Sequence, residues 1–458
     1  MSFSKDFVWG AASASYQIEG GAGEDGKGLS VWDVFSHRPG KTFDGHHGDV
    51  AADAYHRFEE DLDIMASIGI KNYRFSLSWP RILPEGCGKV NKAGLSYYDR
   101  VVDGCLARGI TPWITLYHWD LPYALYLKGG WLNRETALHF GEYARLVGTH
   151  FKGRVKHYMT INEPQCAIGM AHISGLHAPG TILPDSETFL SWHNILLAHG
   201  FAVRAQRESV PDASIGLAST GALTYMKDRP SKTPEGLAEA AFCSLPREKN
   251  PGWNFNHQWF LDPVCFGQYP DDPHNPWSGF TSGISRDDLD IISSPVDFIG
   301  LNIYNGTEVE RDSQGQIKIC DKYPGYPRNS LGWPVTPGVL YWGPRIIWER
   351  YKLPVYITEN GQPCYDRIYA DGKVHDADRI DYLDTYLSHL KKAAGDGVDI
   401  RGYFHWSFTD NYEWHSGYDH RFGLVYIDYR NQKRIPKDSA YWYRDLIRSN
   451  GENLSPLS

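Results

Sequence analysis

The sequence lacks the features that would attach it to a membrane, a nucleic acid or a disulfide framework. No run of about 18 apolar residues occurs, so no membrane-spanning helix is expected. Its 46 basic residues are outnumbered by 55 acidic ones, and the net charge of −9 argues against a phosphate backbone or an anionic membrane as partner. The 7 cysteines are scattered, without a C-x-x-C pair or a zinc-ligand spacing, so we expect reduced thiols and no metal.

The sequence also lacks obvious signals of export or of division into parts. No apolar segment typical of a secretion signal follows Met1, which together with the unpaired cysteines favours a cytoplasmic protein. No linker or low-complexity stretch divides the chain, so we expect a single domain over residues 1–458. Nothing in the sequence determines the oligomeric state, and a homo-oligomer is compatible with it.

What the sequence does contain is an alternation of short β-like runs and longer segments with a helical apolar stripe. The eight runs span residues 7–11, 71–76, 110–118, 156–162, 214–219, 296–304, 354–359 and 400–408. Helical candidates span residues 55–68, 95–108, 137–151 and 378–394. This alternation predicts an α/β fold with a parallel sheet, and eight units favour a closed (β/α)8 TIM barrel.

A doubly wound open sheet is the alternative, but no G-x-G-x-x-G opens a helix after the first run. Two stretches, residues 221–295 and 305–350, are rich in loop-forming residues such as proline, glycine and aspartate. We expect them to be elaborated loops that follow barrel strands, the position from which a barrel builds its site.

Two glutamates stand at the ends of the fourth and seventh runs, Glu163 and Glu359. Because side chains alternate along a strand, each glutamate shares a face with apolar residues before it. If those apolar residues fill the barrel interior, both carboxylates face each other across its mouth. The residues sharing a face are Met159 and Ile161 with Glu163, and Val355 and Ile357 with Glu359.

Two facing carboxylates are the groups that glycoside hydrolysis requires. One carboxylic acid protonates the leaving oxygen, and the other carboxylate attacks the anomeric carbon or activates a water. Retention of configuration needs a separation of about 5–5.5 Å and inversion roughly 6.5–9.5 Å, so residue order alone leaves both outcomes open. The structural alternative is that each glutamate is an ordinary polar residue that ends a strand.

A set of motifs in fixed order makes the interpretation more specific. They are Phe7–Ala11, Ser15–Gly20, Tyr73–Ser76, Tyr117–Pro122, Asn162–Pro164, His177–Gly180, Thr358–Gly361, Asp410–Trp414 and Arg421–Gly423. From about residue 5 to residue 445 the chain thereby resembles glycoside hydrolase family 1, the β-glucosidase family. The resemblance implies that Glu163 is the acid/base and that Glu359 is the nucleophile.

The resemblance also implies supporting and sugar-binding residues. Arg74 and Tyr304 should assist Glu359, Asn162 should hold the sugar 2-hydroxyl, and Asn302 should support the pair. A cis peptide is implied between Trp406 and Ser407. The implied hydroxyl-binding and stacking residues are Gln17, His118, Trp119, Trp406, Glu413 and Trp414.

The entrance for the leaving group, or aglycone, departs from the family pattern. Many members carry tryptophan after Asn-Glu-Pro, whereas this chain has Gln165 followed by Cys166. We expect Gln165 to shape the aglycone side together with Trp333. No catalytic role is expected for Cys166.

The function that follows is a retaining β-glucosidase acting on terminal β-D-glucosyl residues of cello-oligosaccharides or aryl and alkyl β-glucosides. Side activity on β-galactosides or β-fucosides is expected. We expect the reaction to need no metal and no cofactor. Glu413 favours unphosphorylated sugars, because a carboxylate repels a phosphate. The alternatives are a sugar-binding module that has lost catalysis and a phosphate-binding barrel enzyme; an intact glutamate pair and the lack of a glycine-rich phosphate loop argue against them.

Overall fold

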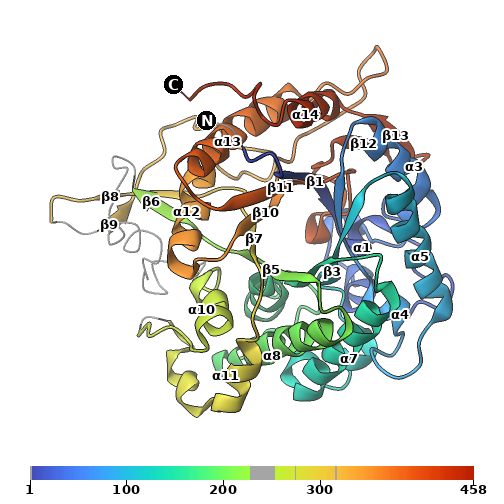
Figure 1. Ribbon diagram of the computed structural model, residues 1–458, viewed down its shortest axis with the longest axis vertical. Helices are drawn as coiled ribbons and strands as arrows, with labels where there is room; N and C mark the ends of the chain where they lie inside the picture. Colours follow the sequence, from blue (N-terminus) through green and yellow to red (C-terminus); the bar gives the residue numbers. More distant parts are fainter. Residues whose placement is uncertain (1–2, 227–252, 274, 315–316, 458) are drawn as a thin grey trace.

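The computed structural model describes residues 3–226, 253–273, 275–314 and 317–457. Eight parallel strands close into a barrel in the order β1-β11-β10-β7-β5-β4-β3-β2, and helices surround it (Figure 1). The strands are β1 Val8–Ser13, β2 Asn72–Ser76, β3 Thr111–Tyr117, β4 His157–Asn162, β5 Ser214–Thr220, β7 Ile299–Asn302, β10 Val355–Asn360 and β11 Ile400–Trp406. The (β/α)8 prediction is confirmed.

The open-sheet alternative is wrong because β1 is hydrogen-bonded on both sides. Gly10 of this strand is in register with Asn72 of β2 and with Phe404 of β11. The first strand therefore pairs with the last one, which closes the barrel and leaves it without an edge.

Long helices lie between the strands, and the four helical candidates from the sequence are among them. The long helices are α3 Ala54–Ser67, α5 Lys92–Ala107, α7 Arg134–Phe151, α8 Asp185–Ser209, α12 Val339–Tyr351, α13 Ala377–Gly395 and α14 Asp438–Arg448. Helix α8 has 25 residues, but the apolar periodicity of the sequence does not predict it. Its buried residues occur on nearly every turn and on most sides, so no single apolar stripe marks it.

The two loop-rich stretches do carry the elaborations expected of them. Residues 227–252 of the first stretch lie outside the described residues. The remainder holds β6 Thr224–Met226, α10 Gln258–Phe266, η4 Ser278–Gly283 and α11 Arg286–Ile292. The second stretch holds β8 Thr307–Arg311 and β9 Ile317–Ile319, which form a small sheet with β6 (Figure 1).

Shorter elements complete the connections around the barrel. They are α1 Ser15–Ile18, α2 Val31–Ser36, η1 Phe43–Gly45, α4 Trp79–Ile82, α6 Tyr123–Tyr126, η2 Gly130–Leu132, η3 Gln165–Ile173, η5 Trp414–Ser416 and the hairpin of β12 Val425–Asp428 with β13 Lys433–Pro436. Within the described ranges, no helix combines the length and the apolar character needed to cross a membrane.

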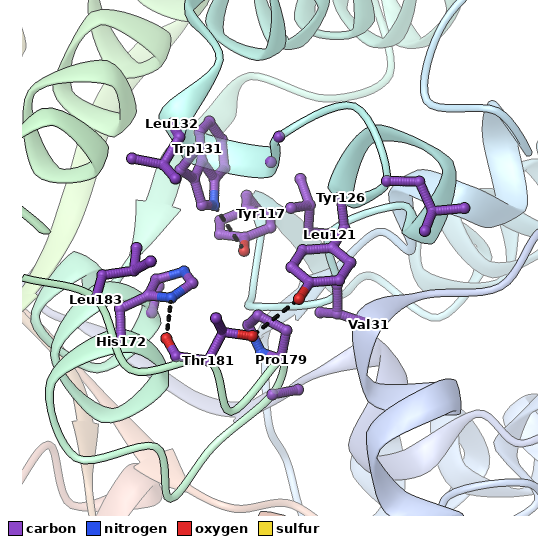
Figure 2. A pocket seen from close by; sticks show the side chains of 15 residues that line it. Val31, Tyr117, Leu121, Tyr126, Trp131, Leu132, His172, Pro179, Thr181 and Leu183 are labelled. Carbon is purple, nitrogen blue, oxygen red and sulfur yellow. Dashed lines mark hydrogen bonds between the residues drawn. The ribbon is translucent and has the colours of Figure 1, made fainter. Parts of the chain in front are cut away.

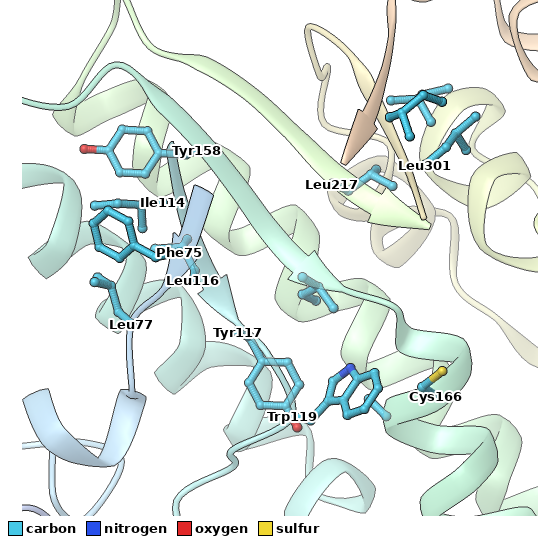
Figure 3. Packing of buried hydrophobic residues seen from close by; sticks show 14 of the residues in the cluster. Phe75, Leu77, Ile114, Leu116, Tyr117, Trp119, Tyr158, Cys166, Leu217 and Leu301 are labelled. Carbon is cyan, nitrogen blue, oxygen red and sulfur yellow. The ribbon is translucent and has the colours of Figure 1, made fainter. Parts of the chain in front are cut away.

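The core has two layers, one inside the barrel and one between strands and helices. Trp113, Met159 and Phe404 belong to the inner cluster. The outer cluster includes Phe75, Ile114 and Tyr158, and Figure 3 shows side chains of that cluster gathered beside the strands. Apolar burial on both faces of each strand explains why the runs are almost continuously apolar.

The expectation that four apolar residues before the glutamates fill the barrel interior is wrong for three of them. Only Met159 belongs to the inner cluster. Ile161, Val355 and Ile357 pack in the outer cluster with the helices, whereas Tyr356 packs against the inner one.

The reason is a break in strand register just before each glutamate. The pairing of β4 with β5 shifts between Met159 and Asn162, and that of β10 with β7 shifts between Ile357 and Glu359. An extra residue moves the following side chains to the opposite face. The side chains of both glutamates therefore point into the mouth of the barrel because of these register shifts, which simple alternation along a strand does not predict.

Candidate active site

A cavity of about 450 Å³ lies at the carboxyl ends of the barrel strands. Glu163 and Glu359 both line it, the former just after β4 and the latter near the end of β10. Other lining residues include Asn302, Tyr304 and Trp406. A cavity of this size suits a monosaccharide unit with part of its leaving group.

Arg74 on β2 holds one glutamate and one amide in place from beneath the cavity. Its Nη1 donates to Glu359 Oε1 at 2.6 Å, and its Nη2 donates to Asn162 Oδ1 at 2.5 Å. Its Nε donates to Thr115 Oγ1 at 3.1 Å. The guanidinium is 1% exposed, so it acts on Glu359 through a medium that screens charge weakly.

Asn302 at the end of β7 links the two glutamate-bearing strand ends. Its Oδ1 accepts from the hydroxyl of Thr358 at 2.7 Å, which fixes the orientation of the amide. Its Nδ2 donates to Glu163 Oε1 at 2.7 Å and to Asn162 Oδ1 at 3.0 Å. The amide therefore orients Glu163 without bringing a charge to it.

The two glutamates differ in the charges that surround them. Burial and the neighbouring Glu359 raise the pKa of Glu163 to about 8. Burial also raises the pKa of Glu359 above its ordinary value, but the Arg74 guanidinium and the Tyr304 hydroxyl, which donates at 2.7 Å, both oppose that rise. The cation is in direct contact with Glu359 alone, so a proton shared by the pair resides on Glu163.

A polar wall on the other side of the cavity presents open hydrogen-bonding atoms. Asn162 Oδ1 accepts from Arg74 and Asn302, so its Nδ2 donates to His118 Nε2 at 3.1 Å. Burial and the Arg74 charge lower the pKa of His118 well below its usual value, which keeps the ring neutral. The proton of His118 therefore sits on Nδ1, a buried atom with no partner among the described residues.

Glu413 continues the cavity wall, and Gln17, which is buried outside the cavity lining, contacts it. Gln17 Nε2 donates to Asn411 Oδ1 at 3.0 Å and lies 3.4 Å from Glu413 Oε2. Its Oε1 has no partner within the described part of the chain. Burial and the neighbouring glutamates raise the pKa of Glu413 to about 8. Open donors and acceptors of this kind match the hydroxyls of a sugar.

Aromatic rings form the remaining surface around the sugar-binding residues. His118 stacks on Trp406 at a centroid distance of 5.8 Å and an angle of 20°. The rings of Trp119 and Trp414 lie 4.6 Å apart. These rings are buried but line the cavity, which offers an apolar face to one side of a pyranose.

The backbone at these positions is unusual. Trp119, Glu163 and Trp414 have φ values of 76°, 46° and 54°, in the region that disfavours residues other than glycine. Non-glycine residues in this region cluster at active sites and ligand-binding sites. The cis peptide between Trp406 and Ser407 expected from the resemblance is confirmed.

The structure separates the two residues expected on the aglycone side. Trp333 lines the cavity, and its ring lies 5.5 Å from that of Tyr304. Gln165 is fully buried, donates to Ser219 Oγ at 3.0 Å and is absent from the cavity lining. Its neighbour Cys166, the second residue of η3, lines the cavity instead.

Several cavity residues were not singled out from the sequence. They include Met170, His177, Phe255, Leu331, His415 and Phe422. His177 and Phe422 belong to two of the ordered motifs, so a closer reading of those motifs would have found them. Phe255 and Leu331 come from the elaborated loops, Met170 from η3 and His415 from η5, and none of these four belongs to a motif or to a periodic pattern.

A second cavity, of about 360 Å³, lies beside η3 and has a different chemistry (Figure 2). Its lining is mainly apolar, and its polar groups bond to one another: Tyr126 with Thr181 at 2.9 Å, and Trp131 with Tyr117 at 3.3 Å. Among the described residues that line it, none is a carboxylate. The candidate active site is therefore the cavity with the glutamate pair.

Comparisons with known proteins agree with this geometry. The sequence model of glycosyl hydrolase family 1 matches residues 1–452. β-Glucosidase A of Thermotoga maritima is 44% identical over 450 residues, covering 98% of this chain and 98% of that protein. An aryl-phospho-β-D-glucosidase of Bacillus subtilis is 40% identical, covering 99% of this chain and 98% of its own length. The structure of the Thermotoga maritima β-glucosidase in complex with noeuromycin has a TM-score of 0.88 at 42% identity, over 98% of this chain and 99% of that one.

Proposed function

The chain belongs to glycosyl hydrolase family 1, and from this premise we propose that it is a retaining β-glucosidase with Glu163 as acid/base and Glu359 as nucleophile. The observation that carries the assignment of roles is the position of Arg74, which contacts Glu359 at 2.6 Å, whereas no cation among the described residues pairs with Glu163. One buried carboxyl is thus kept protonated while the other is kept ionised.

In the first step, a Glu359 oxygen attacks the anomeric carbon of the glucoside. The bond from that carbon to the leaving oxygen breaks, and Glu163 gives its proton to the leaving oxygen. The product is an α-linked glucosyl ester of Glu359. Loss of the aglycone from the Trp333 side leaves room for water.

In the second step, water attacks the same carbon from the face that the aglycone left. Glu163, now ionised, accepts a proton from the water, and the ester bond to Glu359 breaks. The two inversions give glucose with the β configuration. Asn162 holds the 2-hydroxyl throughout, a contact that strengthens in the transition state.

Azide rescue tests both roles with an aryl β-D-glucoside as substrate. Replacement of Glu359 by glycine should lower kcat by at least about 10³-fold, because the attacking group is gone. Azide should restore turnover by entering in place of the carboxylate and should yield α-glucosyl azide. The matched variant Glu163→Ala should instead yield β-glucosyl azide, because azide then attacks the glucosyl ester. Identical azide anomers from the two variants would refute the assignment.

The Bacillus subtilis relative raises a second candidate substrate, a 6-phosphorylated glucoside. The lining of the cavity argues against it for this chain, because its described residues offer no cation to pair with a phosphate. Glu413 lines the cavity together with the glutamate pair, and among its described lining residues there is no lysine or arginine. Comparing kcat/KM for an aryl β-glucoside and its 6-phosphate tests this choice. A higher value for the phosphorylated substrate would reverse it.

The finer parts of the proposal follow from the same site. Cello-oligosaccharides and aryl or alkyl glucosides are the expected substrates. Side activity on β-galactosides or β-fucosides is expected because galactose differs from glucose only in its configuration at C4. No step of the proposed mechanism uses a metal or a cofactor. The extent of one domain over residues 1–458, a cytoplasmic location and a homo-oligomeric state stay predictions.

A further inference from the structure

A cluster of two histidines and one aspartate lies outside the cavity, on the surface segment that follows α2. We propose that His37, His47 and Asp49 form a binding site for a divalent transition cation such as Zn²⁺. Their ligand atoms all lie within 4.8 Å of one another. Nothing in the glycosidase reaction uses these residues, so the site is independent of the proposed catalysis.

Each imidazole nitrogen lies about one ligand-to-ligand distance from a carboxylate oxygen of Asp49, and one ligand atom from each of the three residues lies within 4.8 Å of the others. His37 Nε2 lies 3.2 Å from Asp49 Oδ2, and His47 Nδ1 lies 3.3 Å from Asp49 Oδ1. Neighbouring ligands of a tetrahedral zinc ion with bonds of about 2.0–2.1 Å are roughly 3.4 Å apart. Two imidazoles and one carboxylate oxygen leave the fourth position for water, which is a common zinc ligand set.

The hydrogen bonds of His37 orient its lone pair toward the cluster. Its Nδ1 lies 2.7 Å from the backbone oxygen of Asp33, an atom that can only accept, so Nδ1 carries the proton. Nε2 then faces a carboxylate oxygen of Asp49 at 3.2 Å, where it can either donate a proton to that oxygen or, as an unprotonated nitrogen, share a cation with it. An imidazole whose other nitrogen donates to a backbone carbonyl is also the usual arrangement of a metal-binding histidine.

The surroundings of the Nδ1 atom of His47 also favour a cation at this cluster. It is buried and has no hydrogen-bond partner among the described residues, although a carboxylate oxygen is only 3.3 Å away. The ring itself is stacked on that of His37 at a centroid distance of 4.6 Å, while the side chain is 43% exposed. The cluster therefore lies at the molecular surface, although the Nδ1 atom of His47 is itself covered.

The site is attached to the segment that carries Glu413 and Trp414. The hydroxyl of Tyr418 donates to the backbone oxygen of His47 at 2.7 Å, and that of Tyr412 donates to the backbone oxygen of His46 at 3.1 Å. An ion that joins His37 to His47 would fasten α2 to this segment. Binding to the folded state alone should therefore raise the thermal midpoint.

Calorimetric titration of the full chain with ZnCl₂, after removal of bound metal with EDTA, tests the proposal. We expect the wild type to bind one ion that the variants His37→Ala and His47→Gln bind at least about 10-fold more weakly. Saturating Zn²⁺ should raise the Tm of the wild type by about 1–3 °C and leave that of both variants unchanged. Cobalt bound at this site should give the visible absorption of nitrogen and oxygen ligands, a second readout independent of activity.

His56 provides a matched control. Its side chain is 50% exposed and it lies beside two carboxylates, Asp53 at 2.6 Å and Glu24 at 3.0 Å, but no second histidine among the described residues completes a site there. His56→Ala should bind Zn²⁺ as the wild type does. Absence of binding in the wild type, or equal binding by His47→Gln and the wild type, would overturn the proposal. Circular dichroism of each variant checks that it is folded.

Discussion

Tyr304 donates its hydroxyl to the carboxylate that also receives the Arg74 guanidinium, so two donors hold Glu359 in its ionised form. A hydrogen bond to a charged group contributes about 1.5–3 kcal/mol. We expect Tyr304→Phe to lower kcat by about 10- to 150-fold, since each 1.36 kcal/mol corresponds to a factor of ten. Removal of the donor should also raise the pKa of Glu359, so the acidic limb of the pH profile should move to higher pH.

Steady-state kinetics between pH 4 and 9 measure both effects. A variant with unchanged kcat and an unchanged acidic limb would show that Tyr304 is a simple packing residue. Tyr365→Phe is a suitable control, because that tyrosine is 71% exposed and outside the cavity lining.

The raised pKa of Glu163, about 8, sets the alkaline limit of activity. The protonated form is present below that pKa and is lost as the pH rises through it. We therefore expect kcat/KM to fall above about pH 8, since this parameter reports the free enzyme. With Glu163→Gln and a dinitrophenyl glucoside, whose leaving group needs no proton, the alkaline limb should disappear. An alkaline limb that persists in that variant would assign it to another group.

At the scale of elements, a buried network of charges joins the loops after β10 and β11. Lys437, at the start of α14, contacts Asp366 at 2.6 Å and Asp410 at 2.7 Å. Arg379 of α13 contacts Asp366 at 2.7 Å, and Arg421 contacts Asp410 at 2.6 Å. The second loop continues to Glu413 and Trp414, so this network helps to position the sugar-binding end of the cavity.

Replacing Lys437 by methionine should destabilise the fold by about 3–5 kcal/mol, because two buried carboxylates lose a partner. Burial raises the pKa of Asp366, but Lys437 and Arg379 outweigh it and hold that pKa at about 2. The stability that Asp366 contributes is thus complete above about pH 4 and is lost as the pH falls towards 2. Urea unfolding at pH 7 and pH 3 measures both effects.

Besides its lower stability at pH 7, Lys437→Met should show a smaller loss of stability between pH 7 and pH 3 than the wild type. Lys392→Met is the matched control, since Lys392 pairs with Asp396 on the surface and is 46% exposed. Its replacement should change stability by less than about 1 kcal/mol. Equal effects of the two substitutions on the free energy of unfolding would mean that the buried network contributes no more to stability than a surface ion pair does.

At the scale of the whole molecule, closure of the barrel depends on close approach at β1. A Cβ added to Gly10 would lie 2.5 Å from Cδ1 of Phe404 and 2.7 Å from the backbone oxygen of Asn72. Neither neighbour can withdraw without moving β11 or β2. We expect Gly10→Ala to destabilise the protein by about 1–3 kcal/mol. Thermal unfolding measures this, with Gly23→Ala as control because nothing lies within 4 Å of its added Cβ.

The sequence by itself determined the number of barrel strands and their order along the chain. Apolar runs and helical stripes are local patterns, so they can be recognised in the sequence alone. It also indicated Glu163 and Glu359, since both follow a strand and both belong to motifs of the family. Most of the remaining predicted site residues line the cavity as well, whereas Gln17, Arg74, Asn162 and Gln165 are buried outside its lining. Helix α8, buried on most sides, and the loops without a motif could not be located in this way.

Only the tertiary structure decided how the site works. Arg74 and Glu359 are 285 residues apart, so their contact, which separates the two glutamates in charge, appears in no local pattern. The register shifts that turn both glutamates inward depend on pairing with neighbouring strands. The proton position on His118 depends on an amide oriented by Arg74 and Asn302. Each of these features arises from groups that are distant in the chain and adjacent in space, which is why sequence periodicity carries no trace of them.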